Sequence, residues 1–152
     1  MSNATAQLIR VNAKGVWKGG VHTSISVRDF PSFDMDEPPE LGGTDLGPNP
    51  MEFVVAALNG CVSVMIALIA KEQEFTYDGV EFESTGIIDL RGLAGVEGVS
   101  PHFQKIRFDV IFKTEESEER ISALRREVER RCPALNLLKD AGVVLDAEWK
   151  KG

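Results

Sequence analysis

One long apolar segment, residues 49–73, most restricts how this chain can fold. It reads NPMEFVVAALNGC and continues VSVMIALIAKEQ. Asn49 suits an N-cap, Pro50 suits the first helical position, and Glu52 lies three residues after the cap, so we expect a helix to begin at Asn49. The helix that follows is apolar on nearly every face, which predicts that it is buried all round.

The size of the chain limits how such a helix can be covered. A single chain of 152 residues has few layers with which to enclose it. The surplus apolar surface therefore favours burial against a second subunit, and we expect a homodimer. Polar and small residues interrupt the longest apolar run, residues 53–70, so we expect no membrane span and no membrane partner.

The remaining elements follow from periodicity. Apolar residues alternate with polar ones in four regions, which predicts strands within residues 6–28, 80–90, 106–112 and 143–149. Turns are expected at Gly15 and at the Gly19–Gly20 pair. Residues 29–48 contain four prolines and three glycines and should form an irregular loop, as should the glycine-rich residues 91–102.

A second helical segment follows the third strand region. Residues 115–131 have one apolar stripe, an acidic first turn and an arginine-rich last turn, as an amphipathic surface helix requires. Pro133 ends that helix and can begin a short one over residues 133–140. We find no repeat and no linker. The sequence thus predicts one α+β domain, residues 1–152, with an antiparallel sheet, a long buried central helix and this second helical segment.

Charge and composition exclude several functions. The net charge is −7 and the isoelectric point about 4.9, so the surface repels phosphate backbones and nucleic acid is not an expected partner. The N-terminus has no apolar signal core, which favours the cytoplasm. Two cysteines about seventy positions apart do not form a disulfide scaffold, and no His or Cys pair has metal-ligand spacing, so we expect no metal site.

The two cysteines are the candidates for chemistry. Cys61 follows Gly60 within the apolar helix, and the glycine leaves room for another chain or a substrate to approach the sulfur. Cys132 precedes Pro133, where free N–H groups at the start of a helix would stabilise a thiolate and lower its pKa, with Arg130 and Arg131 adding positive charge. Position alone also fits inert, packed thiols at both places.

Two motifs carry a resemblance to a known family. They read GGTDLGPNPMEFVVAALNGC, residues 42–61, and RCPALNLLKDAGVVL, residues 131–145, and they occur in that order. Together they resemble the signatures of the OsmC/Ohr family of osmotically inducible and organic hydroperoxide resistance proteins, over most of the chain. The resemblance implies an intertwined homodimer whose two long central helices are enclosed by sheets from both subunits.

The resemblance also implies a chemistry. It is that of a thiol-dependent peroxidase for small organic hydroperoxides, active in oxidative stress defence without heme, metal or flavin. Cys61 would attack the peroxide and become a sulfenic acid, and Cys132 would condense with it to a disulfide that an external dithiol reduces. The central helix and the loop residues Leu93, Val96 and Val99 are expected to surround the Cys61 sulfur with hydrocarbon.

The activating groups of this family are shifted here. Its peroxidases carry a glutamate directly after the Asn-Pro and an N-terminal arginine. In this chain Met51 follows Pro50, and the acid is Glu52, nine residues before Cys61. Nine residues turn a helix by about 900°, which places the two on opposite faces and favours Glu52 as a helix cap. Arg28 is the candidate arginine, with a solvated strand residue as the alternative.

Two other functions remain open at this stage. The same fold could hold a small apolar ligand without catalysis or act as a redox sensor, or it could be a structural domain with two inert cysteines. The distance between the two cysteines separates these hypotheses, because a disulfide needs Cα atoms within about 7 Å.

Overall fold

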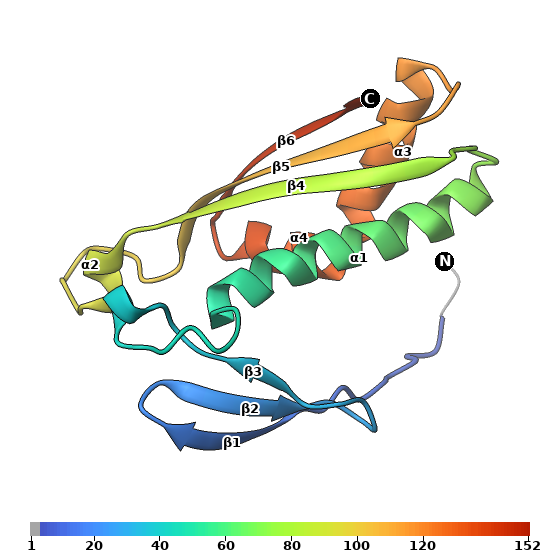
Figure 1. Cartoon of the computed structure of the whole chain (residues 1–152). Helices are drawn as coiled ribbons and strands as arrows, with labels where there is room; N and C mark the ends of the chain where they lie inside the picture. The colour runs from blue at the N-terminus through green and yellow to red at the C-terminus, as the bar shows by residue number, and fades with distance from the viewer. Residues whose placement is uncertain (1–3) are drawn as a thin grey trace. The chain divides into compact units, whose positions relative to one another are not determined.

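The computed structural model describes residues 4–152 and combines helices with strands, which confirms the α+β class (Figure 1). The chain divides into two compact units, Met1–Phe53 and Val54–Gly152. One helix, α1 (Pro50–Glu72), runs through the boundary. The expectation of one continuous domain over residues 1–152 stays a prediction.

The N-terminal unit contains a three-stranded antiparallel sheet. Its strands are β1 (Lys14–Gly19), β2 (His22–Ser26) and β3 (Phe33–Met35), in that order. Gly19 and Gly20 form the first turn with φ of 119° and 55°, values that favour glycine. Gly15 pairs with Ile25 inside β1, so the turn expected there is wrong.

The segment 29–48 is more regular than its prolines indicate. It contains β3 and a 3₁₀ helix, η1 (Pro39–Leu41). The strand is possible because Pro31 and Pro38 lie outside the three residues that pair as β3. After β3, the buried carboxylate of Asp36 accepts hydrogen bonds from the backbone N–H groups of Glu37, Thr44 and Leu46 and from the Thr44 hydroxyl. The bond from that hydroxyl, with help from the backbone N–H groups, lowers the pKa of Asp36 to about 2.

The C-terminal unit is built on a mixed sheet of β4 (Gly79–Ile88), β5 (Phe103–Lys113) and β6 (Val144–Lys151). β4 and β5 are antiparallel, as predicted, but β6 is parallel to β5. The helices α3 (Glu118–Arg131) and α4 (Pro133–Asp140) cause this, since they carry the chain back to the start of β5. A short helix, α2 (Leu90–Leu93), begins the segment expected to be a loop, with Asp89 as its N-cap.

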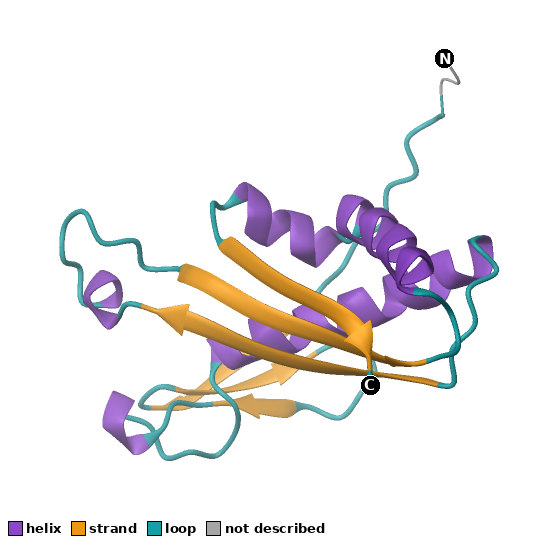
Figure 2. Cartoon of the chain, turned by 90° about the horizontal axis from the view of Figure 1, so that it is seen from above, coloured by secondary structure: helices purple, strands orange, loops and turns teal. Residues whose placement is uncertain are grey.

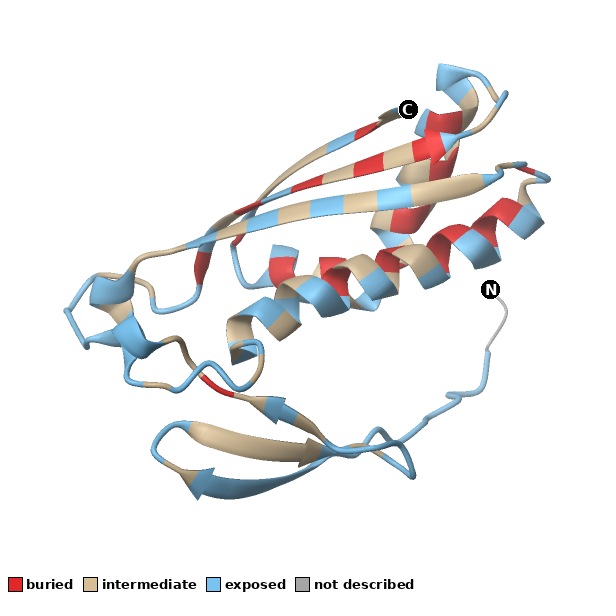
Figure 3. Ribbon diagram, viewed as in Figure 1, coloured by how far each residue is buried: buried red, intermediate tan, exposed pale blue. Residues whose placement is uncertain are grey.

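The helices α1, α3 and α4 lie on one side of this sheet (Figures 1 and 2). Burial alternates along β5 (Figure 3), where Ile106, Phe108, Val110 and Phe112 are buried. The opposite face is charged, and on it Arg107 pairs with three carboxylates. The buried side chains supplied by the three helices are Leu58, Val62, Met65, Ile66, Ile69, Ala70, Ile121, Leu124, Val128, Leu135 and Leu138.

Within one chain α1 is buried on one side only, so the expectation of burial all round is not met. Its sheet-facing side is closed to solvent (Figure 3), whereas Val64 and Leu68 on the other side are 59% and 52% exposed. Within residues 4–152, α1 is the one helix whose length and hydropathy suffice to cross a membrane, and 33% of its most apolar window is buried. The expectation that the interrupted apolar run is too short for a membrane span is therefore wrong as regards length and hydropathy.

Packing between β4 and β5 gives a first testable prediction. A Cβ on Gly86 would lie 2.3 Å from Cε1 of the buried Phe103 ring. Gly86→Ala should lower the free energy of unfolding by about 1–3 kcal/mol through overpacking. In Gly79→Ala, on the same strand, the nearest atom is 3.9 Å away, on Lys113, and no loss is expected. Urea unfolding of both variants measures the difference, and equal stabilities would contradict this packing.

Candidate functional site

The structure brings the two cysteines of the chain into contact. Cys61 lies in the middle of α1, and Cys132 lies between α3 and α4. Their Sγ atoms are 3.4 Å apart, with the Cys132 thiol donating a hydrogen bond to the Cys61 sulfur, and both thiols are free. The sulfurs need to approach by about 1.4 Å to form a disulfide. The fold therefore supplies the proximity that a redox pair requires.

The two thiols differ in their access to solvent. Cys132 is fully buried, at 0% exposure, whereas Cys61 is half-buried. Beside it, a Cβ on Gly60 would meet no atom within 4 Å beyond the local helix. A reagent that enters from solvent therefore reaches Cys61 and not Cys132.

Burial decides the acidity of Cys132. Its pKa is raised from the ordinary 9.0 to about 11, mainly by loss of solvation and to a smaller extent by the hydrogen bond and charge at Cys61. The Leu135 and Ala134 backbone N–H groups at the start of α4 act in the opposite direction, but more weakly in sum. The expectation that this helix N-terminus makes Cys132 acidic is therefore wrong. Cys132 is therefore expected to stay a protonated thiol near neutral pH.

The two arginines before Cys132 are already paired. Arg130 contacts Glu127 at 2.8 Å, and Arg131 contacts Glu72 at the end of α1 at 2.6 Å. They were expected to add positive charge near the thiolate, but their charge is matched by carboxylates. The ion pair between Arg131 and Glu72 instead ties the end of α3 to α1.

Glu52 has the role of a helix cap, as its position predicts. Its backbone N–H donates to Oδ1 of Asn49 at 2.8 Å, and its carboxylate accepts from the Asn49 backbone N–H at 2.7 Å. This reciprocal pair is a capping box. Since α1 is one continuous helix, Glu52 and Cys61 project from opposite faces of it.

Arg28 lies two residues beyond the end of β2 and is not part of the strand. It has a φ of 49°, in the left-handed region, and its guanidinium stacks 4.6 Å from the centre of the Phe30 ring. Neither feature links it to Cys61, so its role as the activating arginine stays a prediction.

Sequence reasoning missed three polar residues that fix the helices carrying the thiols. Asn59 accepts a hydrogen bond from the Ser84 hydroxyl, which fixes α1 against β4. Glu72 holds Arg131, and Asn136 bonds the backbone where α3 meets α4. A signal was present for the two asparagines, because asparagine is a poor helix former and inside a helix often marks a specific hydrogen bond.

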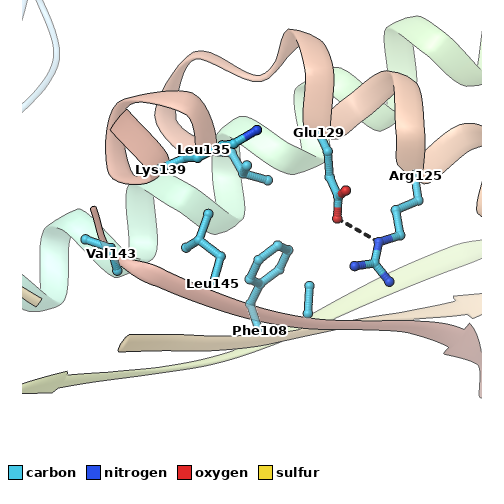
Figure 4. Close-up of a pocket in the computed structure, with 8 residues that line it drawn as sticks. Phe108, Arg125, Glu129, Leu135, Lys139, Val143 and Leu145 are labelled. Atoms are coloured by element: carbon cyan, nitrogen blue, oxygen red, sulfur yellow. Dashed lines mark hydrogen bonds and ion pairs between the residues drawn. The ribbon is translucent and has the colours of Figure 1, made fainter. Parts of the chain in front are cut away.

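The described residues offer no metal site beside the thiol pair. No cluster of His, Cys, Asp and Glu within residues 4–152 could hold a metal ion. Leu93 and Val96, expected to cover the Cys61 sulfur, are exposed. A cavity of about 300 Å³ lies between the sheet and the two C-terminal helices (Figure 4). It is lined by Phe108, Arg125, Glu129, Leu135, Lys139, Val143, Leu145 and Ala147.

That cavity offers little to a ligand. Phe108, Leu135 and Val143 on its floor are already buried, so an occupant would remove little further apolar surface from water. At its rim Arg125 and Glu129 neutralise each other across 2.6 Å, as Figure 4 shows. The thiol pair therefore remains the candidate site.

Comparison with known proteins points to one family. The model of the family described as OsmC-like protein matches residues 43–148. The OsmC-like protein of Mycoplasma pneumoniae is 17% identical with a TM-score of 0.81, covering 94% of this chain and 97% of that one. No curated protein matches the chain.

Two further solved structures are named for hydroperoxide resistance. The organic hydroperoxide resistance protein OsmC of Legionella pneumophila is 19% identical with a TM-score of 0.72, covering 97% of this chain and 99% of that one. The organic hydroperoxide resistance protein OhrB of Bacillus subtilis is 21% identical with a TM-score of 0.66, covering 94% and 99%. At these identities the similarity shows the fold.

The burial of Cys132 predicts how the thiols react. Iodoacetamide at pH 8 should label Cys61 first, and Cys132 should stay slow in Cys61→Ser because its burial is unchanged. Because the pKa of Cys132 is higher in the folded than in the unfolded chain, its contribution to the free energy of unfolding is fully present below pH 9. That contribution should be lost as the pH rises from about 9 to 11. Mass spectrometry of each cysteine against pH measures the rates. Labelling of native Cys132 as fast as in urea would contradict this burial.

Proposed function

This chain belongs to the OsmC-like family, and on that premise we propose that it reduces organic hydroperoxides through Cys61 and Cys132. Membership, with neighbours named for hydroperoxide resistance, supports a role in peroxide or stress defence. The observation that carries the cysteine chemistry is the 3.4 Å contact between the two sulfurs.

In the first step the Cys61 thiolate attacks an oxygen of the hydroperoxide. An S–O bond forms as the O–O bond breaks, so that Cys61 is oxidised to a sulfenic acid and the alkoxide leaves as the alcohol after gaining a proton. The half-buried Cys61 suits this role, because it is the thiol that solvent reaches.

In the second step Cys132 attacks the Cys61 sulfur. The S–S bond forms as the S–O bond breaks, and the hydroxyl group leaves as water with the proton of the Cys132 thiol. In the reduced pair the Cys132 thiol donates a hydrogen bond to the Cys61 sulfur. The raised pKa of Cys132 is thus compatible with its role, because the leaving hydroxyl takes up the proton.

An external dithiol would then reduce the disulfide and supply the two electrons of each cycle. No metal, heme or flavin enters these steps. In the dimer proposed below, Ala57 and Val64, one turn to either side of Cys61, would line an apolar cleft where the two subunits meet, which favours an organic hydroperoxide over hydrogen peroxide.

We also propose that the protein acts as a homodimer in the cytoplasm. The exposed side chains of Val54, Ala57, Val64 and Leu68 follow each other at alternating helical spacings of three and four residues, with Cys61 between them. This is the spacing of a seam between two helices. A second copy of α1 is the proposed cover, and nucleic acid and membrane are not proposed partners.

One observation favours the alternative of redox sensing or apolar ligand binding. Glu52 is occupied in its capping box, and Arg130 and Arg131 are occupied in ion pairs. None of these groups is therefore free to activate the Cys61 thiolate, and slow oxidation of a thiol pair suits a sensor better than a fast enzyme.

The peroxidase proposal predicts turnover. The protein should consume cumene hydroperoxide with a dithiol reductant, and Cys61→Ser should lower the rate by about a hundredfold or more, because the nucleophile is lost. Cys132→Ser should accumulate sulfinic acid on Cys61, visible by mass spectrometry. No turnover of any organic hydroperoxide by the wild type would refute catalysis, and formation of the disulfide without turnover would support the sensor.

The dimer proposal is tested by mass in solution. Light scattering after size exclusion should give about twice the chain mass of 16.7 kDa. Val64→Glu should produce monomer, since it puts a charge into the apolar seam. Leu137→Glu is the matched control, because Leu137 is 72% exposed and belongs to α4 rather than to the seam on α1. A monomeric wild type would refute the dimer.

A further inference from the structure

Cys132 stands at a corner between two helices. α3 ends at Arg131 and α4 begins at Pro133, and Cys132 between them has extended backbone angles, with φ of −69° and ψ of 117°. Its N–H still bonds to the Val128 carbonyl at 2.8 Å, so it belongs to the last turn of α3. Its placement therefore depends on both helices, since its N–H belongs to α3 and it is the N-cap of α4.

Pro133 leaves that corner one donor short. In a continuing helix the N–H of residue 133 would bond to the carbonyl of Glu129, four residues earlier, but proline has no N–H. The carbonyl of Arg130 loses its helical partner as well, since the chain turns there. Without a substitute these carbonyls would have no donor from the helix.

The side chain of Asn136 supplies the missing donor. Its Nδ2 atom donates to the carbonyls of Cys132 at 2.8 Å, Glu129 at 3.0 Å and Arg130 at 3.3 Å. Its backbone N–H also donates to the Cys132 carbonyl, at 3.0 Å. One side chain of α4 thus holds the last turn of α3 and the peptide of Cys132 together.

We propose that Asn136 is a positioning residue that holds the Cys132 sulfur against Cys61 by fixing the corner between α3 and α4. This rests on the proposed redox pairing of the two cysteines. It extends that pairing by naming the group that sets how readily the disulfide closes. Asn136 touches neither sulfur and acts through the backbone of Cys132.

The consequence is a competition at the Cys61 sulfenic acid. When Cys132 is in place, its sulfur displaces the hydroxyl group and the disulfide forms with release of water. When the corner opens, a second hydroperoxide instead transfers an oxygen to the sulfenic acid, giving a sulfinic acid and a second molecule of alcohol. Loss of Asn136 should therefore shift the product from disulfide to sulfinic acid.

The test measures the thiol–disulfide equilibrium of the full chain in glutathione buffers. The two thiols and one oxidised glutathione give the protein disulfide and two reduced glutathiones, so the ratio reports the effective concentration of one thiol at the other. Asn136→Asp, which keeps the shape but loses the donors, and the neutral Asn136→Ala should each lower it about tenfold or more.

Two further variants serve as rescue and control. Asn136→Gln keeps an amide donor on a longer side chain and should recover part of the effective concentration. Leu137→Ala alters the next residue of α4, which is 72% exposed, and should leave the effective concentration unchanged. If Asn136→Asp and Asn136→Ala both unfold, Asn136→Gln decides. Its amide is displaced, so its effective concentration must still be lower than that of Leu137→Ala.

A merely structural role gives a different result. It would lower the free energy of unfolding of the Asn136 variants while their folded forms kept the wild-type effective concentration, and that outcome overturns the proposal. The glutathione measurement uses no peroxide, so it stands or fails apart from catalysis. Where the wild type does turn over hydroperoxide, more sulfinic acid on Cys61 in Asn136→Asp than in Leu137→Ala supports the proposal, and equal amounts overturn it.

Discussion

Burial of one face of α1 against the C-terminal sheet is the constraint on which the rest of this structure depends. Leu58, Val62, Ile66 and Ile69 are nearly closed to solvent, and each such side chain contributes about 1.5–3 kcal/mol when it is fully buried. This contact fixes the rotation of α1 about its axis. The rotation in turn fixes where Cys61 points and leaves an apolar side of α1 uncovered.

The same packing gives the two cysteines unequal properties. The end of α3 is held on α1 by the ion pair between Arg131 and Glu72, and the sulfur of Cys132 comes to lie under the protein surface. There the loss of solvation outweighs the helix N-terminus, and its pKa rises. A sulfenic acid pathway needs this division of roles. The accessible thiol is oxidised first, and the buried, protonated thiol reacts with it in the second step.

Much of the fold was predictable because its signals are local. The capping box of Asn49 and Glu52, the break at Pro133 and the short helix over residues 133–140 all follow from neighbours in sequence. The errors concern non-local relations. Gly15 was expected in a turn and pairs within a strand, and β6 was expected to be antiparallel, because strand direction depends on how the helices return the chain.

The sequence by itself determined where α1, α3 and α4 lie to within a few residues, that α1 is too apolar for one chain to cover, and which two residues could carry thiol chemistry. Only the tertiary structure decided that those two sulfurs meet, which of them is buried, and in which direction the pKa of Cys132 moves. The reason is physical. Capping and helix propensity act between residues a few positions apart, whereas desolvation and contact depend on atoms that folding brings together from distant parts of the chain.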